Sequence, residues 1–141
     1  MASEGALRGM VATRVKQYDP DAHVRQVENA AGAGDPDTYV CSKGRSVWLE
    51  LKYMPRPKRA TTALRGRHIR TSQLLWAADH LKAGGNVWFL VQVGRDYYLL
   101  TPAVAAALKH GLAPEELDRR ASVIYRGHLP PDMMEDALAG A

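Results

Sequence analysis

Two acidic residues and a lysine stand where the sequence indicates neighbouring strands. Asp37 closes the segment 34–37, and Glu50 and Lys52 follow it in the chain. Apolar and polar residues alternate over 46–52, which is the period of a strand, so Glu50 and Lys52 point to the same face. Burying a carboxylate and an ammonium among apolar residues costs free energy. We therefore expect these side chains to do chemistry, namely to hold a divalent cation and activate a water molecule.

The helical spacing of apolar residues, together with capping and helix-ending residues, predicts the helices around these residues. Residues 3–18 form an amphipathic pattern with Ser3 as N-cap, ended by Asp19-Pro20-Asp21. A second helix begins near Thr71, capped by Thr71 or Ser72, and stops at Gly84-Gly85. Its expected apolar face consists of Leu74, Leu75, Ala78 and Leu81. Later helical segments are expected at 102–110, after Pro114 and as a final turn after Pro131.

Strand patterns fill the remaining chain. Expected strands cover 23–28, 38–41, 46–52, 86–93, 97–100 and 123–125, with a hairpin turn at 42–45. The segment 86–93 is the most apolar and is expected at the centre of the sheet. Of the two neighbours Tyr97 and Tyr98, alternation predicts one buried and one exposed ring. This order of elements predicts one α/β domain over 1–141 with a mixed sheet flanked by helices.

Charge is unevenly distributed along the chain. The 141 residues carry a formal net charge of +4, yet no acidic residue occurs between Glu50 and Asp79. The basic residues expected to contact a polyanion in that window are Arg56, Lys58, Arg59, Arg65, Arg67 and Arg70. The lone Cys41 excludes an internal disulfide, and the sequence shows neither a membrane-spanning run nor a signal peptide. We expect a cytoplasmic protein.

The ordered set of motifs resembles the PD-(D/E)XK nuclease superfamily, which has a restriction-endonuclease-like core. The closest likeness is to phage and archaeal Holliday-junction resolvases and to the VRR-NUC group. It covers about residues 3–100, leaving 101–141 as a C-terminal extension, and it rests on Gly34-Asp35-Pro36-Asp37, Glu50-Leu51-Lys52 and the helix bearing Gln73. A phage origin, with action in the host cytoplasm, stays open.

The resemblance implies a role for each matching residue. Asp37 and Glu50, with the Leu51 carbonyl, would bind Mg²⁺ or Mn²⁺, ions that favour such oxygen ligands. Lys52 would position or deprotonate the attacking water or neutralise charge on the phosphate. Gln73 would orient Lys52 or the nucleophile, and Glu4 would complete a second metal position.

Some assignments have competitors in the sequence. Asp35 is an alternative ligand, although a turn role suits it better. Glu28 competes with Glu4, and Glu4 at a helix start also fits a partner of the helix dipole. His68 is expected to be a solvated loop histidine. The segment 32–34 precedes no helix, so a nucleotide cofactor is not expected.

The expected function is a magnesium-dependent endodeoxyribonuclease acting on branched DNA, with Holliday-junction resolution as the leading role. Two symmetric cuts would call for a homodimer, whose interface could use the apolar strand 86–93 or the elements beyond Leu100. Alternatives are a VRR-NUC-like flap or single-strand nuclease, a restriction-type nuclease, or a non-catalytic DNA-binding module on the same fold. The sequence leaves the preferred DNA shape open.

Overall fold

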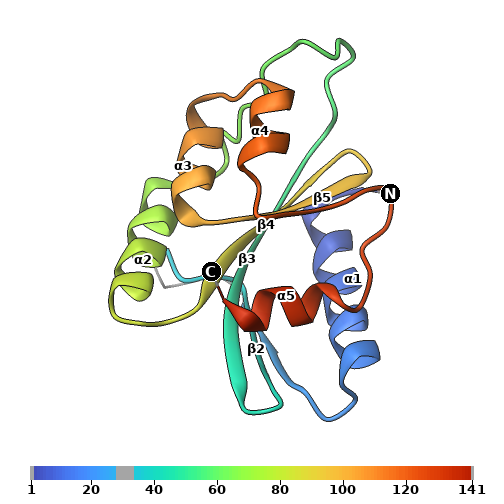
Figure 1. Cartoon of the computed structure of the whole chain (residues 1–141), viewed down its shortest axis with the longest axis vertical. Helices are drawn as coiled ribbons and strands as arrows, with labels where there is room; N and C mark the ends of the chain where they lie inside the picture. The colour runs from blue at the N-terminus through green and yellow to red at the C-terminus, as the bar shows by residue number, and fades with distance from the viewer. Residues whose placement is uncertain (1, 28–33, 141) are drawn as a thin grey trace.

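A mixed β-sheet lies at the centre of the computed structural model, which describes residues 2–27 and 34–140 (Figure 1). The described residues form six strands in the order β1-β2-β3-β4-β5-β6. Only β3 and β4 are parallel; the other neighbours are antiparallel. The strands are β1 (His23–Gln26), β2 (Thr38–Ser42), β3 (Arg45–Met54), β4 (Val87–Val93), β5 (Asp96–Leu100) and β6 (Val123–Tyr125).

Helices cover both faces of this sheet (Figure 1). On one face lie α1 (Glu4–Tyr18) and α5 (Met133–Ala139); on the other lie α2 (Thr71–Lys82), α3 (Pro102–His110) and α4 (Pro114–Arg120). Each face buries its own apolar core. Leu7, Val11 and Val15 of α1 are fully buried against the first face, as their helical spacing predicts. The predicted α/β class, with a mixed sheet flanked by helices, is confirmed.

The register of three strands fixes the position of the polar residues. The last Cα pair between β2 and β3 is Thr38 with Leu49, so β3 continues past the start of β2. The crossover from β3 to the parallel strand β4 runs through the loop 55–70 and α2, as a parallel connection requires. Consequently the segment that precedes β2 and the start of α2 meet over the middle of β3.

The second helix differs from its prediction in cap and face. Its N-cap is Arg70, one residue before Thr71 and two before Ser72, the two predicted caps, and the Arg70 N–H donates to the Gln73 side chain. The buried positions are Gln73 and Ala77, whereas Leu75 is 62% exposed. The expected face was right in part, because Leu74 and Leu81 pack against the core, whereas Leu75 and Ala78 are exposed and the polar Gln73 takes a buried position that apolar periodicity could not reveal.

The C-terminal segments contribute to both sides of the sheet. Leu117 of α4 is buried in the core under α2 and α3, while Met133 and Met134 of α5 are buried in the core under α1. The strand β6 pairs with β5 and forms one edge. Every residue of β4 is buried within the chain, so this strand is central, as predicted, and is excluded as a dimer interface. Among the described residues, no helix is long and apolar enough to cross a membrane.

Candidate active site

Asp37 stands immediately before β2, beside the part of β3 that continues beyond the start of β2. Its Oδ1 accepts a hydrogen bond from the Thr38 hydroxyl at 2.8 Å, and its Oδ2 accepts one from the Leu51 N–H at 3.2 Å. The β2–β3 pairing stops at Thr38 and Leu49. Beyond it, the Asp37 carboxylate accepts the Leu51 N–H in place of a backbone carbonyl of β2. The N–H and C=O of a strand residue point to the same side, so the Leu51 carbonyl also faces Asp37.

Glu50 is the buried centre of the site. Its side chain shares a face with Lys52, whose ammonium lies 3.1 Å from Glu50 Oε2. Gln73 reaches the same oxygen from α2, donating through Nε2 at 3.0 Å. Glu50, Lys52 and Gln73 are each less than 7% exposed. Within the described part of the chain no hydrogen bond reaches Glu50 Oε1, so that oxygen remains available to a ligand.

Burial sets the protonation of both carboxyl groups. Loss of solvent raises the pKa of Glu50 to about 7, with the charge of Asp37 as the next cause. Burial likewise raises the pKa of Asp37, opposed by its hydrogen bonds from Thr38 and Leu51. Perturbed carboxyl pairs of this kind are typical of functional sites.

A cavity of about 320 Å³ opens above these groups. The cavity is lined by predicted site residues together with others that the sequence analysis did not place there. The lining residues are Glu4, Arg8, Val27, Asp35, Asp37, Glu50, Lys52, His68, Arg70 and Gln73. Glu4 is therefore at the site, as the resemblance implied. Glu28, its competitor, lies outside the described residues, as do positions 32 and 33 of the small-residue segment.

His68 and Arg8 are the residues that sequence reasoning missed. His68 Nε2 lies 3.4 Å from Glu4 Oε2 but is buried without a hydrogen bond to the described residues. Burial lowers the pKa of His68, yet its side chain is 36% exposed, so the expectation of a solvated histidine is met only in part: His68 is half-buried and lines the cavity. Arg8 stands one helical turn after Glu4, and this spacing could have placed both in the same cavity.

The carboxylates fit a hard divalent cation. Asp37 and Glu50 offer the oxygen atoms that Mg²⁺ and Mn²⁺ prefer, and their mutual repulsion, seen in the pKa of Glu50, would be relieved by a cation. Over residues 2–27 and 34–140, no three His, Cys, Asp or Glu side chains cluster as a complete metal-binding set. The remaining ligands would thus be the Leu51 carbonyl and water molecules, which Mg²⁺ habitually retains.

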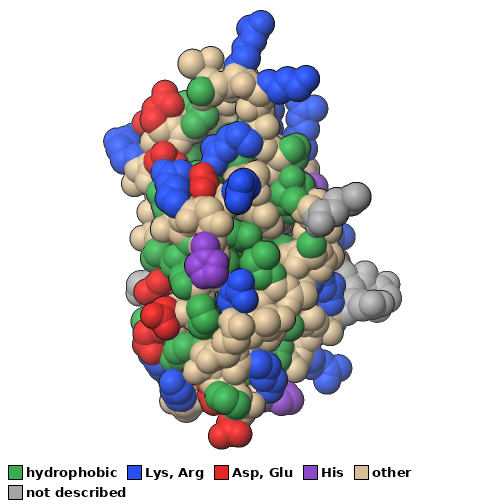
Figure 2. Space-filling view, turned by 90° about the vertical axis from the view of Figure 1, so that its right-hand side faces the viewer, with side chains coloured by type: hydrophobic (Ala, Val, Ile, Leu, Met, Phe, Trp, Pro, Cys, Tyr) green, Lys and Arg blue, Asp and Glu red, His purple; other side chains and the backbone are tan. Residues whose placement is uncertain are grey.

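The basic residues of the loop 55–70 lie in three different settings. Arg56 is bound to Asp96 at 2.9 Å and to the Tyr98 hydroxyl at 3.1 Å, and Arg65 donates to the His110 carbonyl. Arg70 lines the cavity. All six predicted residues are exposed: Arg56, Lys58, Arg59, Arg65, Arg67 and Arg70. Figure 2 shows Lys and Arg side chains projecting from the end of the molecule where this loop lies.

Comparison with known proteins identifies a fold and no sequence family. No protein-family model matches the chain, and no curated protein is similar to it. Among solved structures, the chain is similar to Hjc, a Holliday junction resolvase from the archaeal hyperthermophile Archaeoglobus fulgidus. The TM-score is 0.50 at 10% identity, covering 84% of this chain and 98% of that one. The likeness supports the predicted resolvase-like, restriction-endonuclease-like architecture.

Proposed function

We propose that this protein is a metal-dependent endonuclease that hydrolyses phosphodiester bonds in branched DNA, with Holliday-junction resolution as its leading role. The observation that carries the proposal is the convergence of Asp37, Glu50, Lys52 and Gln73 in one cavity. These side chains come from the segment just before β2, from β3 and from α2, and nothing in the packing of the two cores requires buried charges at this place. A pure binding module would gain nothing from carboxylates facing phosphate.

Each residue has a distinct task in this mechanism. Asp37, Glu50 and the Leu51 carbonyl would hold Mg²⁺ or Mn²⁺, which when bound lowers the pKa of a water and stabilises charge on the phosphate. Gln73 fixes Glu50 Oε2, which leaves Oε1 directed at the ligand. Lys52 positions or deprotonates the attacking water, or neutralises developing negative charge. Arg8 and Arg70 line the same cavity and supply positive charge for the scissile phosphate.

A cleavage assay with one matched control tests the catalytic proposal. Wild type is expected to nick a four-way junction with Mg²⁺ or Mn²⁺ and not with EDTA. Asp37→Asn should lose roughly 100-fold or more of that activity, whereas Asp21→Asn, an exposed aspartate outside the cavity, should retain it. Absence of cleavage by wild type with any divalent cation would overturn the nuclease assignment.

The junction role adds a requirement for two active sites. We propose a two-fold homodimer in solution, since resolution needs two symmetric cuts. The edge strand β6 or the helix α5 are the C-terminal elements available to form it, because β4 is buried within the chain. Sedimentation should give twice the 15.5 kDa chain mass. A monomer, or equal cleavage of junction, flap and linear duplex, would remove the resolvase role and leave a nuclease.

A further inference from the structure

A run of aromatic rings extends from the catalytic residues across the same side of the sheet. This aromatic strip consists of His23, Tyr39, Trp48, Trp76 and His80. Consecutive ring centroids lie 6.3, 5.0, 5.7 and 4.8 Å apart. The strip is not part of a closed core, because His23 is exposed and the other four side chains are partly exposed.

The register of β2 and β3 places the aromatic strip next to the carboxylates. Tyr39 and Trp48 are Cα partners across β2 and β3. Tyr39 is two residues after Asp37, which stands just before β2, and Trp48 is two residues before Glu50 on β3, so Trp48 shares the face of Glu50. Two strand residues span about 7 Å. The strip therefore begins about one nucleotide away from the proposed cleavage point.

The helix α2 repeats this arrangement. Trp76 follows Gln73 by three residues and His80 follows by seven, which puts all three on one stripe of the helix. The His80 ring stacks on Trp76 with 23° between the ring planes. Gly85 closes against it, since a Cβ there would lie 2.2 Å from His80 Nε2. Each of the three segments thus carries an aromatic ring two or three residues from a site residue.

Solvent reaches the rings from two hollows. One of about 560 Å³ is lined in part by Trp48, His80 and Asn86, and another of about 370 Å³ is lined by Trp76, Asp79 and His80. Positive charge accompanies the rings, because Arg25 is the Cα partner of Tyr39 on β1 and is exposed. Flat aromatic faces beside a cation match the chemistry of unpaired nucleobases on a phosphate chain.

We infer that the aromatic strip binds the unpaired bases of a single strand adjoining the bond to be cut. This inference rests on the proposed nuclease function and adds branched DNA with a single-stranded arm to its substrates, since the paired arms of a four-way junction offer the strip no free bases. Bases inside a duplex are stacked on each other and present no free faces, so a duplex could not occupy the strip. Along β3 the carboxylates lie between the strip, on the Trp48 side, and the basic loop, which follows Lys52.

Binding in EDTA separates this inference from catalysis. Two fluorescent duplexes carry a single-stranded arm of the same length, one of thymidines and one of abasic residues, so that phosphate charge is equal. Wild type should bind the thymidine arm at least about fivefold more tightly, because base–aromatic stacking of even the weaker kind gives that factor. Trp76→Ala should lose this preference, and Trp76→Phe should retain most of it.

Leu75→Ala is the matched control, since Leu75 neighbours Trp76 on α2 but is 62% exposed and outside the strip. It should bind both arms as wild type does. His80→Ala, which leaves the indoles in place, provides a second variant if Trp76→Ala fails to fold, and it should also weaken the thymidine preference.

Equal binding of the two arms by wild type would overturn the inference, as would equal behaviour of Trp76→Ala and Leu75→Ala. Conversion of a dimer to a monomer by Trp76→Ala, with the base preference intact, would instead assign the strip to contact between two copies. Failure of the proposed function is distinguishable, because it appears as absence of metal-dependent cleavage of any DNA by wild type.

Discussion

Glu50 combines two opposing requirements at one residue. It must be ionised to hold a cation, yet it is 4% exposed and faces Asp37, so its pKa rises to about 7. Lys52 and Gln73 both engage Oε2 and limit the cost of the buried charge. The Glu50 carboxyl group therefore loses its proton only near neutral pH or when a cation binds beside it.

The first prediction concerns stability as a function of pH. The folded protein retains the Glu50 proton up to about pH 7, whereas the unfolded chain releases it near 4.5. The metal-free protein should therefore lose stability as pH rises through that window, by on the order of 3 kcal/mol. Glu50→Gln should remove most of this loss, measured as the free energy of unfolding in urea at pH 5 and pH 8.

The same unfolding measurements can be repeated with a divalent cation added. Mg²⁺ or Mn²⁺ should stabilise wild type more at pH 8 than at pH 5 and should leave Glu50→Gln unchanged. Cleavage should rise with pH over the same range and level off above it. A wild-type stability that is flat between pH 5 and pH 8 would contradict a raised pKa at Glu50.

A second prediction concerns Gln73, which joins α2 to the carboxylate. Its Oε1 accepts the Arg70 N–H at 2.9 Å while its Nε2 donates to Glu50. Gln73→Ala should cost about 2 kcal/mol of stability, because it removes a helix cap and leaves a buried carboxylate oxygen with one donor fewer. Gln17→Ala, at an exposed glutamine of α1, should cost under about 0.5 kcal/mol. Similar losses in the two variants would show that the Gln73 bridge does not contribute.

At the scale of elements, Gly34 joins the segment carrying Asp37 to the start of α2. Its φ is +89°, and a Cβ there would lie 2.2 Å from the Ser72 carbonyl oxygen. Backbone therefore packs on backbone at this point, and only glycine permits it. The close approach holds the segment that carries Asp37 against the start of the helix that carries Gln73.

A matched pair of glycine variants tests this packing. Gly34→Ala should lower stability by roughly 3 kcal/mol and reduce cleavage, because the clash separates the Asp37 segment from α2. Gly44→Ala, in the β2–β3 turn, has a similar φ of +80° but nothing within 4 Å of its Cβ. It should cost only about 1 kcal/mol from backbone strain and leave cleavage intact. Equal losses would mean that φ alone matters at Gly34.

Local pattern predicted the elements well, because caps, turns and strand periods are short-range signals. The helix 102–110, the hairpin at 42–45 and the strand 123–125 all lie where the pattern placed them. It failed where tertiary contacts decide burial. Tyr97 and Tyr98 are both buried because helices cover both faces of β5.

The candidate site shows the same division. Glu50, Lys52 and Asp37 could be predicted from strand alternation and motif order. The position of His68 could not, since it depends on how the loop 55–70 closes over the sheet, whereas the helical spacing of Arg8 from Glu4 was an available signal. Trp48 and Trp76 pack against the core, as their apolar surroundings in the sequence favour, and only the contact of β3 with α2 brings their rings together near the carboxylates.

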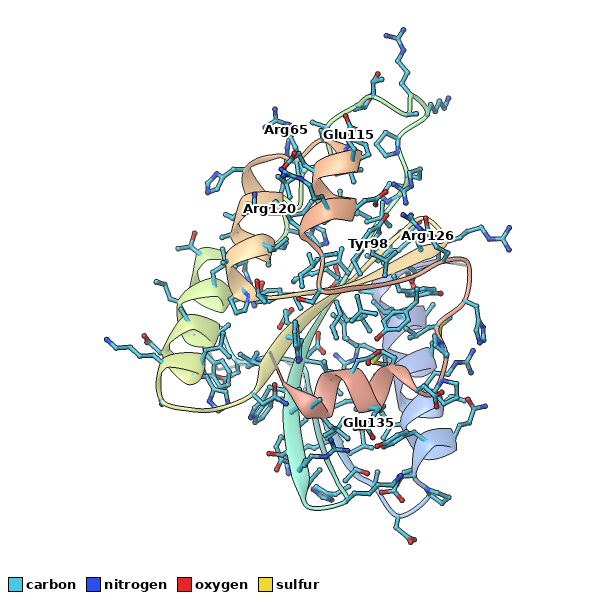
Figure 3. The ribbon with its side chains drawn as sticks, viewed as in Figure 1. Arg65, Tyr98, Glu115, Arg120, Arg126 and Glu135 are labelled. Carbon is cyan, nitrogen blue, oxygen red and sulfur yellow. The ribbon has the colours of Figure 1, made fainter. Side chains whose placement is uncertain are left out.

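At the scale of the whole molecule, the site lies between two surfaces of different chemistry. The loop 55–70 leaves the end of β3 and returns beside the cavity at His68 and Arg70. Its first part is tied down by ion pairs, since Arg56 and Arg126 both bind Asp96. Figure 3 shows Arg126 beside Tyr98, to which it donates at 3.2 Å.

The last prediction separates DNA contact from structural support within this loop. The side chains of Lys58 and Arg59 are exposed and make no hydrogen bond or ion pair with the part of the chain that the structure describes. The double variant Lys58→Ala/Arg59→Ala should therefore keep its stability. It should weaken DNA binding and reduce the slope of log affinity against log salt by about 1 for each lost phosphate contact. Arg56→Ala should instead lose about 1 kcal/mol of stability, because Asp96 and Tyr98 lose a charged donor. An unchanged salt slope in the double variant would remove the loop tip from the DNA-binding surface and confine phosphate contact to the cavity arginines.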